Sequence, residues 1–76
     1  MIKADQVIDV KGLSCPRPLL MTMKTLKEMQ SGHILQVTTD DPTTKLTFRS
    51  FLDRSGDELL ELYQDGKLLH HYIRKK

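Results

Sequence analysis

Two prolines flank an arginine directly after the chain's single cysteine, in the run Cys15-Pro16-Arg17-Pro18, and an amphipathic helical pattern follows them. Proline fits the first turn of a helix, because the first N–H groups of a helix have no intrahelical partner. We therefore expect a helix over 16–29, with Cys15 at its N-cap and the prolines at the first and third helical positions. The prolines thus predict where the first helix begins and which side chain stands at its end.

Cys15 has two possible roles in this position. Unpaired N–H groups and the positive end of the helix dipole favour the thiolate, which is the nucleophilic form of cysteine. A free cysteine is also among the most buried residue types and then packs as a small hydrophobe. The neighbours Ser14 and Arg17 are polar and favour exposure. We predict a reactive thiol, with a core position as the alternative.

The length and the cysteine count limit the classes of function. Seventy-six residues make a single domain, 1–76. Such a chain buries only roughly 60% of its unfolded surface, so a deep substrate cavity is not expected. One cysteine cannot form an internal disulfide or a cysteine-rich metal site, which favours a reducing compartment. The sequence lacks the apolar runs of a signal peptide and of a membrane span. We therefore expect a cytoplasmic protein with no membrane partner.

Charge and aromatic content argue against nucleic acid as a direct partner. The formal net charge is +2, and the two Tyr and two Phe residues carry no RNA-binding signature. The basic run Arg74-Lys75-Lys76 is therefore interpreted as a solvated segment.

The histidines and acidic residues do not form a metal-binding pattern. His70 and His71 are neighbours in a predicted strand, where successive side chains point to opposite faces, and His33 follows a helix end. Asp40 and Asp41 are explained by helix capping. No third group is placed to orient a Cys–His pair for hydrolysis. We expect no metal, no cofactor and no hydrolase activity.

Turn residues and hydrophobic periodicity divide the chain into six elements. Strands are predicted over 7–10, 34–39, 58–63 and 67–74, and a second helix over 42–55. The expected breaks are Gly32 as the cap of the first helix, Asp41 and Gly56 at the ends of the second, and Asp65-Gly66 as a hairpin turn. The order β-α-β-α-β-β begins with a right-handed parallel crossover. The predicted fold is an α/β (α+β) two-layer sandwich, with a four-stranded mixed sheet and two helices on one face.

Each predicted helix has an apolar stripe that we expect to face the sheet. The stripe of the first helix consists of Leu19, Met23, Leu26 and Gln30, and that of the second of Phe48, Phe51, Leu52 and Ser55. Met21 and Leu46 fall on the outer faces, and Leu13 is expected to plug the core below the Cys15 turn.

The run from Asp9 to Pro18 resembles the TusA family of sulfur carrier proteins, also called the SirA-like family. Its pattern is Asp, two residues, Gly-Leu, one residue and then Cys-Pro-x-Pro, which is specific because it is long. Residues 29–32, 40–42, 65–66 and 73–75 match as well, and the family shares the β-α-β-α-β-β layout. The departures, which bear on the choice of partner, are Thr47, Arg49, Leu52 and Asp57.

The resemblance implies that Cys15 accepts sulfane sulfur as a persulfide from a cysteine desulfurase or a rhodanese-like donor. The sulfur then passes to the cysteine of an acceptor protein in a sulfur relay, such as tRNA 2-thiouridine synthesis. Such a protein is a sulfurtransferase-type carrier without independent turnover. Gly12, Pro16 and Pro18 would shape the site. Attack of one sulfur on another needs an exposed thiolate and no pocket, which suits a small domain.

A partner must cover the Cys15 end for two sulfurs to meet. Arg17, Met21 and Lys24 follow one another at 4- and 3-residue steps and form one stripe of the first helix. We expect this stripe to contact the partner, with an ordinary solvated helix face as the alternative, and we expect a monomer.

Two other functions stay open. One is a regulatory protein-binding module in which Cys15 is structural. The other is a thiol redox sensor that cycles through sulfenic acid or a mixed disulfide.

Overall fold

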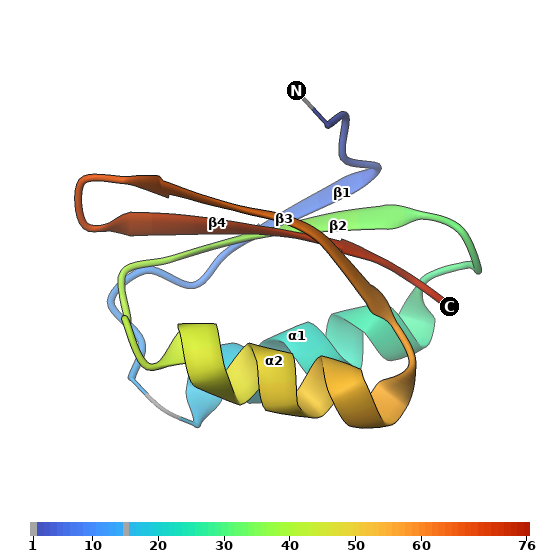
Figure 1. Ribbon diagram of the computed structural model, residues 1–76, viewed down its shortest axis with the longest axis horizontal. Coiled ribbons are helices and arrows are strands. Elements are labelled where there is room, and N and C mark those ends of the chain that lie inside the picture. Colours follow the sequence, from blue (N-terminus) through green and yellow to red (C-terminus); the bar gives the residue numbers. More distant parts are fainter. Residues whose placement is uncertain (1, 15) are drawn as a thin grey trace.

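The computed structural model describes residues 2–14 and 16–76. These residues form β1 (Gln6–Asp9), α1 (Arg17–Glu28), β2 (Ile34–Thr39), α2 (Thr44–Ser55), β3 (Glu58–Asp65) and β4 (Leu68–Arg74). The strands lie in one sheet in the order β1-β2-β4-β3, and both helices cover the same face of it (Figure 1). β1 and β2 are parallel, and β4 is antiparallel to both of its neighbours. The predicted two-layer sandwich with a mixed sheet is confirmed.

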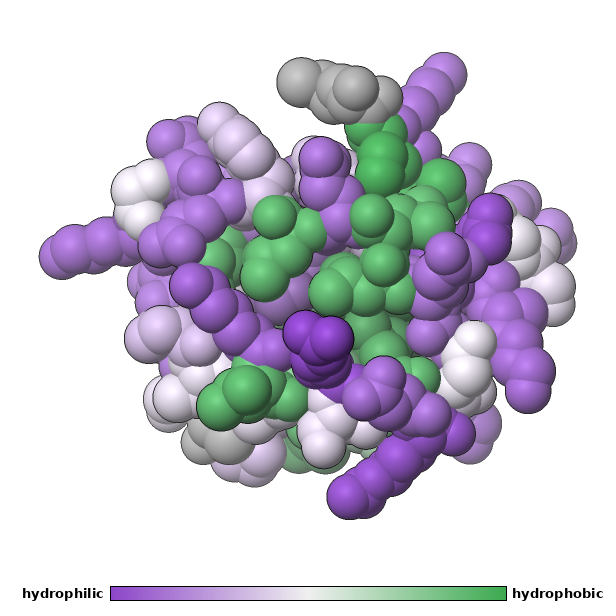
Figure 2. All heavy atoms as spheres, viewed as in Figure 1, coloured by the Kyte–Doolittle hydropathy of each residue, from purple (hydrophilic) through white to green (hydrophobic). Residues whose placement is uncertain are grey.

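The hydrophobic core lies between the sheet and the helix layer. Alternate residues of β2 point toward the helices, which buries Leu35 and Val37 completely. Apolar side chains gather between the two layers, and polar ones cover the periphery of the molecule in this view (Figure 2). The core cluster consists of Val10, Leu26, Leu35, Val37, Phe48, Leu52 and Ile73.

The two helices run in the same direction. β2 and β3 are both antiparallel to β4, and β1 is parallel to β2, so β1, β2 and β3 all point one way. α1 returns the chain from β1 to β2, and α2 returns it from β2 to β3. Both helices therefore begin after the carboxyl end of a strand, and the loops that precede them lie at one end of the molecule (Figure 1).

α1 begins one residue later than the prolines predicted. The carbonyl of Pro16 accepts the first helical hydrogen bond, from the N–H of Leu20 at 3.0 Å. Pro16 is therefore the N-cap, and Pro18 is the second helical residue. The placement of Cys15 at the N-cap, with the prolines first and third, is wrong. Cys15 itself lies outside the described residues.

The buried face of α1 also differs from the predicted stripe. Pro18, Thr22 and Leu26 are buried, whereas Met23 is 39% exposed. Leu19 is half-buried and Gln30 is exposed. Thr22 can face the core because its hydroxyl donates to the carbonyl of Pro18 at 2.8 Å, so burial leaves no polar group unpaired.

α2 begins two residues later than predicted, with Thr43 and not Asp41 as its N-cap residue. Asp41 acts before the helix: its Oδ1 accepts from the N–H and the hydroxyl of Thr43, at 2.9 and 2.7 Å. The left-handed Gly56 ends the helix as predicted. Of the predicted inner residues, Phe48 and Leu52 are buried and Phe51 and Ser55 are half-buried, while Leu46 is 77% exposed on the outer face.

Two turns are displaced from their predicted places. α1 ends on an extended Met29, so Gly32, which does have a positive φ of 86°, lies beyond the cap that it was expected to form. Asp65 pairs with Leu68, which makes Gly66-Lys67 the two-residue hairpin loop and not Asp65-Gly66. A bulge between Leu59 and Glu61 interrupts the alternation of β3.

Candidate functional site

The loops that precede the two helices are joined by a hydrogen bond. The N–H of Gly12, in the loop after β1, donates to Oδ1 of Asp40, in the loop after β2, at 3.1 Å. The two residues lie 28 positions apart in the sequence. We call the region formed by residues 10–14, 16–18 and 40–43 the motif end of the molecule. It contains the described neighbours of Cys15 on both sides.

The segment before Cys15 is held by its own backbone and by the core. Val10 is completely buried, and its carbonyl accepts from the N–H of Leu13 at 3.2 Å. Leu13 is half-buried against the core, as predicted. Gly12 has a φ of 80° and nothing within 4 Å of the place where a Cβ would stand. Glycine is thus required for backbone conformation and not for lack of space.

Asp9 closes the start of the same segment. Its Oδ1 accepts from the N–H of Lys11 at 3.0 Å, and its other oxygen lies 3.4 Å from the Lys11 ammonium. The backbone hydrogen bond and the charge of Lys11 lower the pKa of the Asp9 carboxyl. Asp9 is exposed, so it acts locally as a turn residue and not as a buried acid.

The segment after Cys15 combines a buried and an exposed proline. Pro18 is buried, whereas Pro16 and Arg17 are exposed. The N–H of Arg17 donates to the carbonyl of Ser14 at 3.0 Å, which closes a turn around position 15. Ser14, Pro16 and Arg17, the neighbours of Cys15 in the sequence, are exposed. The position and ionisation of its thiol lie outside the described residues.

The predicted docking stripe is exposed on α1. Arg17 and Lys24 are exposed, and Met21 is 43% exposed between them. Leu20 beside Met21 is 54% exposed, which the sequence reading missed. Helical spacing in the sequence could have predicted this exposure, because Leu20 lies four residues before Lys24 and thus on the same side of the helix. The exposed apolar surface at the start of α1 is wider than the predicted stripe.

The paired histidines lie on opposite faces of the sheet, as predicted. His71 is buried beneath the helices, with its ring centroid 4.5 Å from that of Phe48. His70 lies on the open face, where its Nδ1 is 3.1 Å from the hydroxyl of Thr38 and its ring stacks on Tyr63. Within residues 2–14 and 16–76, no group of three His, Cys, Asp or Glu residues could hold a metal ion.

His71 is connected to the motif end by hydrogen bonds through Thr44. The Thr44 hydroxyl donates to the Asp41 carbonyl at 2.7 Å, so it accepts from His71 Nε2–H at 3.2 Å. The Nδ1 atom then carries the lone pair and is the one buried side-chain polar atom among the described residues with no partner. Burial lowers the pKa of His71 to about 4, and the nearby His70 contributes. The neutral ring of His71 links β4 to Thr44 of α2. Through the Thr44 hydroxyl it also supports the loop after β2, which contains the Asp40 that binds Gly12.

Neither of the helices in the described part of the chain is long and apolar enough to cross a membrane. Each has 12 residues, against the roughly 20 that a spanning helix needs.

The chain matches the family model described as Sulfurtransferase TusA over residues 6–75. It is 40% identical over 75 residues to the sulfur carrier protein TusA of Allochromatium vinosum, with 99% of each chain covered. It is 35% identical over 72 residues to the sulfur carrier protein TusA of Pseudomonas putida, with 95% of this chain and 90% of the relative covered.

The crystal structure of a SirA-like protein from Desulfitobacterium hafniense has the same fold. The TM-score is 0.81 at 22% sequence identity, over 91% of this chain and 95% of the other. The segment matched by the family model, residues 6–75, includes all six elements and both halves of the motif end. With a family match of this extent and a relative that is 40% identical over 99% of each chain, the chain belongs to the TusA family.

Proposed function

We propose that the protein is a cytoplasmic sulfur carrier that holds sulfane sulfur as a persulfide on Cys15. The donor is a cysteine desulfurase or a rhodanese-like protein, and the acceptor is a protein of a sulfur relay, such as that of tRNA 2-thiouridine synthesis. The observation that carries the proposal is the anchored, exposed turn around position 15, in a chain whose relatives are named sulfur carrier proteins.

The reaction consists of two exchanges between sulfur atoms. The Cys15 thiolate attacks the terminal sulfur of the donor persulfide, a bond forms to that sulfur, and the donor's own thiolate leaves. In the second exchange, the acceptor thiolate attacks the terminal sulfur and the Cys15 thiolate leaves. The terminal sulfur keeps its oxidation state throughout, so no outside oxidant or reductant is consumed.

The described geometry suits a carrier because the residues on both sides of position 15 are anchored. Gly12 is tied to Asp40, and Pro18 is buried. A preorganised attacking group needs less ordering when the partner arrives.

Docking in this proposal surrounds the Cys15 turn and uses the exposed start of α1. Arg17 and Lys24 provide charges, and Met21 and Leu20 provide exposed apolar area between them. An apolar centre with cations around it suits a partner with an acidic rim.

Intact-mass spectrometry tests the proposal. The protein is incubated with a cysteine desulfurase and cysteine, and the expected product is heavier by about 32 Da, the mass of one sulfur, and returns to the starting mass after reduction. Cys15→Ser, the matched control, should remain unmodified. A gain of about 16 Da would favour the redox sensor. An unchanged mass with several donors would favour the binding module.

A further inference from the structure

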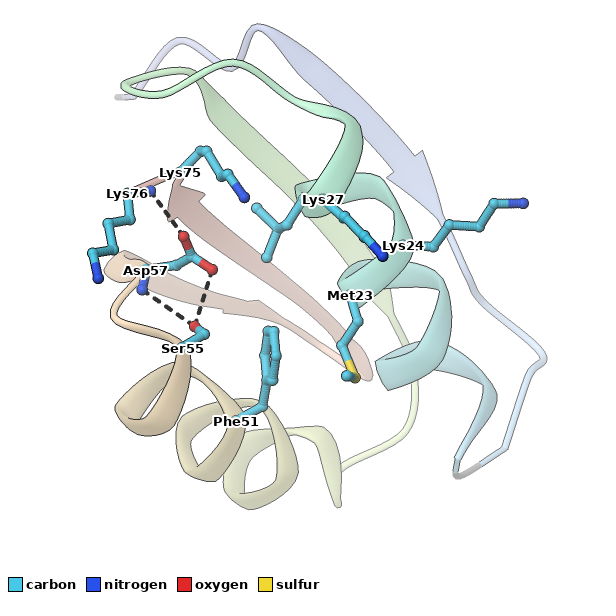
Figure 3. A pocket seen from close by; sticks show the side chains of 9 residues that line it. Met23, Lys24, Lys27, Phe51, Ser55, Asp57, Lys75 and Lys76 are labelled. Carbon is cyan, nitrogen blue, oxygen red and sulfur yellow. Dashed lines mark hydrogen bonds between the residues drawn. The ribbon is translucent and has the colours of Figure 1, made fainter.

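A groove of about 570 Å³ lies between the C-terminal halves of α1 and α2, at the opposite end of α1 from the Cys15 turn. We call it the interhelical groove. Its apolar wall is formed by Leu26 and Met23 of α1 and by Phe51 of α2. Figure 3 shows Phe51 directed into the groove from α2 and Met23 beside its mouth. Met23 is 39% exposed, so this apolar wall is open to a ligand.

Two cations stand on different sides of the interhelical groove. Lys27 comes from the last turn of α1, and Lys75 follows β4. Lys75 extends its ammonium group toward the groove, the Lys27 ammonium lies on the α1 side above Met23, and Lys24 is directed away from the groove (Figure 3). The salt bridges found within the described residues are Lys11–Asp9 and Arg74–Glu58, so neither lysine of the groove is paired there.

The one carboxylate that lines the groove is already engaged. One oxygen of Asp57 accepts from the backbone N–H of Lys76 at 2.8 Å, and the other accepts from the Ser55 hydroxyl at 2.9 Å. Asp57 thereby connects Lys76 to the end of α2, and among the described residues it forms no ion pair with Lys27 or Lys75. The groove offers an apolar wall with a lysine on each of two sides.

Lysine near the end of a helix has an ordinary explanation, because a cation there complements the helix dipole. That explanation covers Lys27 but not Lys75, which lies outside the helices, and it gives no reason for an exposed Met23 between them. A second hollow, of about 310 Å³, shares Met23 and Phe51 with the groove and reaches Leu19 near the start of α1. The apolar surface thus continues along the seam between the helices.

We propose that the interhelical groove binds an acidic amphipathic helix of a protein partner. Apolar side chains at 3- and 4-residue steps would fill the seam, and carboxylates on the two flanks would meet Lys27 and Lys75. A single-chain fatty acid has one carboxylate and cannot match both cations. The inference stands apart from the persulfide proposal, because it concerns the other end of α1 and holds for a carrier and for a regulatory module alike.

Titration of the full ¹⁵N-labelled chain with a designed peptide tests this inference. The peptide has about 14 residues, roughly 21 Å as a helix, with leucines along one face and glutamates on both flanks. We expect backbone amide shifts at residues 23–27, 51–57 and 75–76, and an affinity that falls as salt is added. A peptide of the same composition with dispersed leucines should bind at least about ten-fold more weakly.

Charge reversal identifies the cations. Lys27→Glu with Lys75→Glu should weaken binding of the designed peptide roughly ten-fold or more. Lys45→Glu with Lys67→Glu changes the net charge equally at exposed sites elsewhere and should leave the affinity within about two-fold. If a thermal melt shows that the first pair unfolds, Lys27→Gln with Lys75→Gln removes the same charges.

Three results would overturn the inference: no amide shifts at millimolar peptide, shifts confined to other surfaces, or equal weakening by the two charge-reversed pairs. Preferential binding of a fatty acid or of anionic vesicles at the same residues would also overturn it and would assign the groove to lipid. Loss of peptide binding by Met23→Ser, with sulfur loading of Cys15 retained, would separate this inference from the persulfide proposal.

Discussion

The two ends of the helix layer are built from different interactions. At the motif end, Gly12, Asp40 and Asp41 are held by hydrogen bonds between backbone and carboxylate groups. At the interhelical groove, Met23 and Phe51 present apolar surface that is flanked by lysines without ion partners in the described residues. A directional network fixes a geometry, whereas an apolar groove with lysines at its edges tolerates a range of occupants. The motif end is therefore held in one arrangement, while the groove leaves room for different ligands.

The largest effect is expected from Cys15→Ser, which should lose all sulfur acceptance. A serine hydroxyl is not ionised at neutral pH and does not attack a persulfide, whereas a cysteine thiolate does. The free energy of unfolding should change by less than about 1 kcal/mol, as at surface sites. Labelled sulfur and a denaturant titration measure the two quantities. If the variant unfolds, Cys15 belongs to the core. If the variant still accepts labelled sulfur, Cys15 is not the residue that carries it.

The next effect is a loss of stability in mild acid. The pKa of His71 falls from 6.5 to about 4 on folding, chiefly through burial. Between these values the unfolded chain binds the proton and the folded chain does not, so stability is full above pH 6.5 and falls as the pH drops toward 4. The loss should be about 3 kcal/mol.

Denaturant titrations from pH 7.5 to pH 4 measure this loss. His71→Phe should flatten the pH dependence, because it removes the buried titrating group. His33→Gln alters an exposed histidine and should keep the slope. An unchanged slope in the His71 variant would mean that the motif end is not supported by a neutral His71.

A smaller effect is expected from reversing the charges of the predicted docking stripe on α1. Arg17→Glu with Lys24→Glu should slow sulfur transfer to a protein acceptor roughly ten-fold at low salt, because cations steer an acidic partner. Thermal stability should hardly change at these exposed sites. The groove pair, Lys27→Glu with Lys75→Glu, carries the same change in charge and should slow transfer less. Equal slowing by the two pairs of substitutions would mean that the docking stripe has no special role in sulfur transfer.

The parts of the fold that depend on neighbours in sequence were predictable. Glycines and prolines punctuate the chain at Gly12, Pro42 and Gly56, and the β-α-β-α-β-β order and the exposure of Met21 and Leu46 followed from periodicity. The finer errors have local causes. Thr22 was not predicted to face the core, although the carbonyl of Pro18 satisfies its hydroxyl, and Pro18 and Thr22 are buried where Leu19 and Met23 were expected.

The parts that depend on distant residues could not be predicted. The Gly12–Asp40 hydrogen bond joins loops 28 residues apart, and only the folded sheet brings them together. The interhelical groove is assembled from α1, α2 and the segment after β4, so no short motif encodes it. Sequence patterns therefore revealed the motif around Cys15 but not the contacts that support it.

The smallest effect is expected from two glycine substitutions, which introduce similar backbone strain at different places in the fold. Gly12→Ala should cost about 1 kcal/mol of stability, because alanine disfavours a φ of 80° although no atom lies within 4 Å of the new Cβ. Gly66→Ala, in the hairpin between β3 and β4, meets the same open space at a φ of 61° and should cost a similar amount. The two variants form a matched pair in stability, which a denaturant titration measures.

Sulfur transfer should distinguish this pair. Gly12 donates to Asp40 and sits three residues before Cys15, so strain at Gly12 should shift the turn and slow transfer, whereas Gly66→Ala should transfer at the normal rate. Asp40→Asn keeps an acceptor for the Gly12 N–H and should behave as the parent chain, while Asp40→Ala should resemble Gly12→Ala. Equal transfer rates for the two glycine variants would show that the hydrogen-bonded frame of the motif end does not set the position of the thiol.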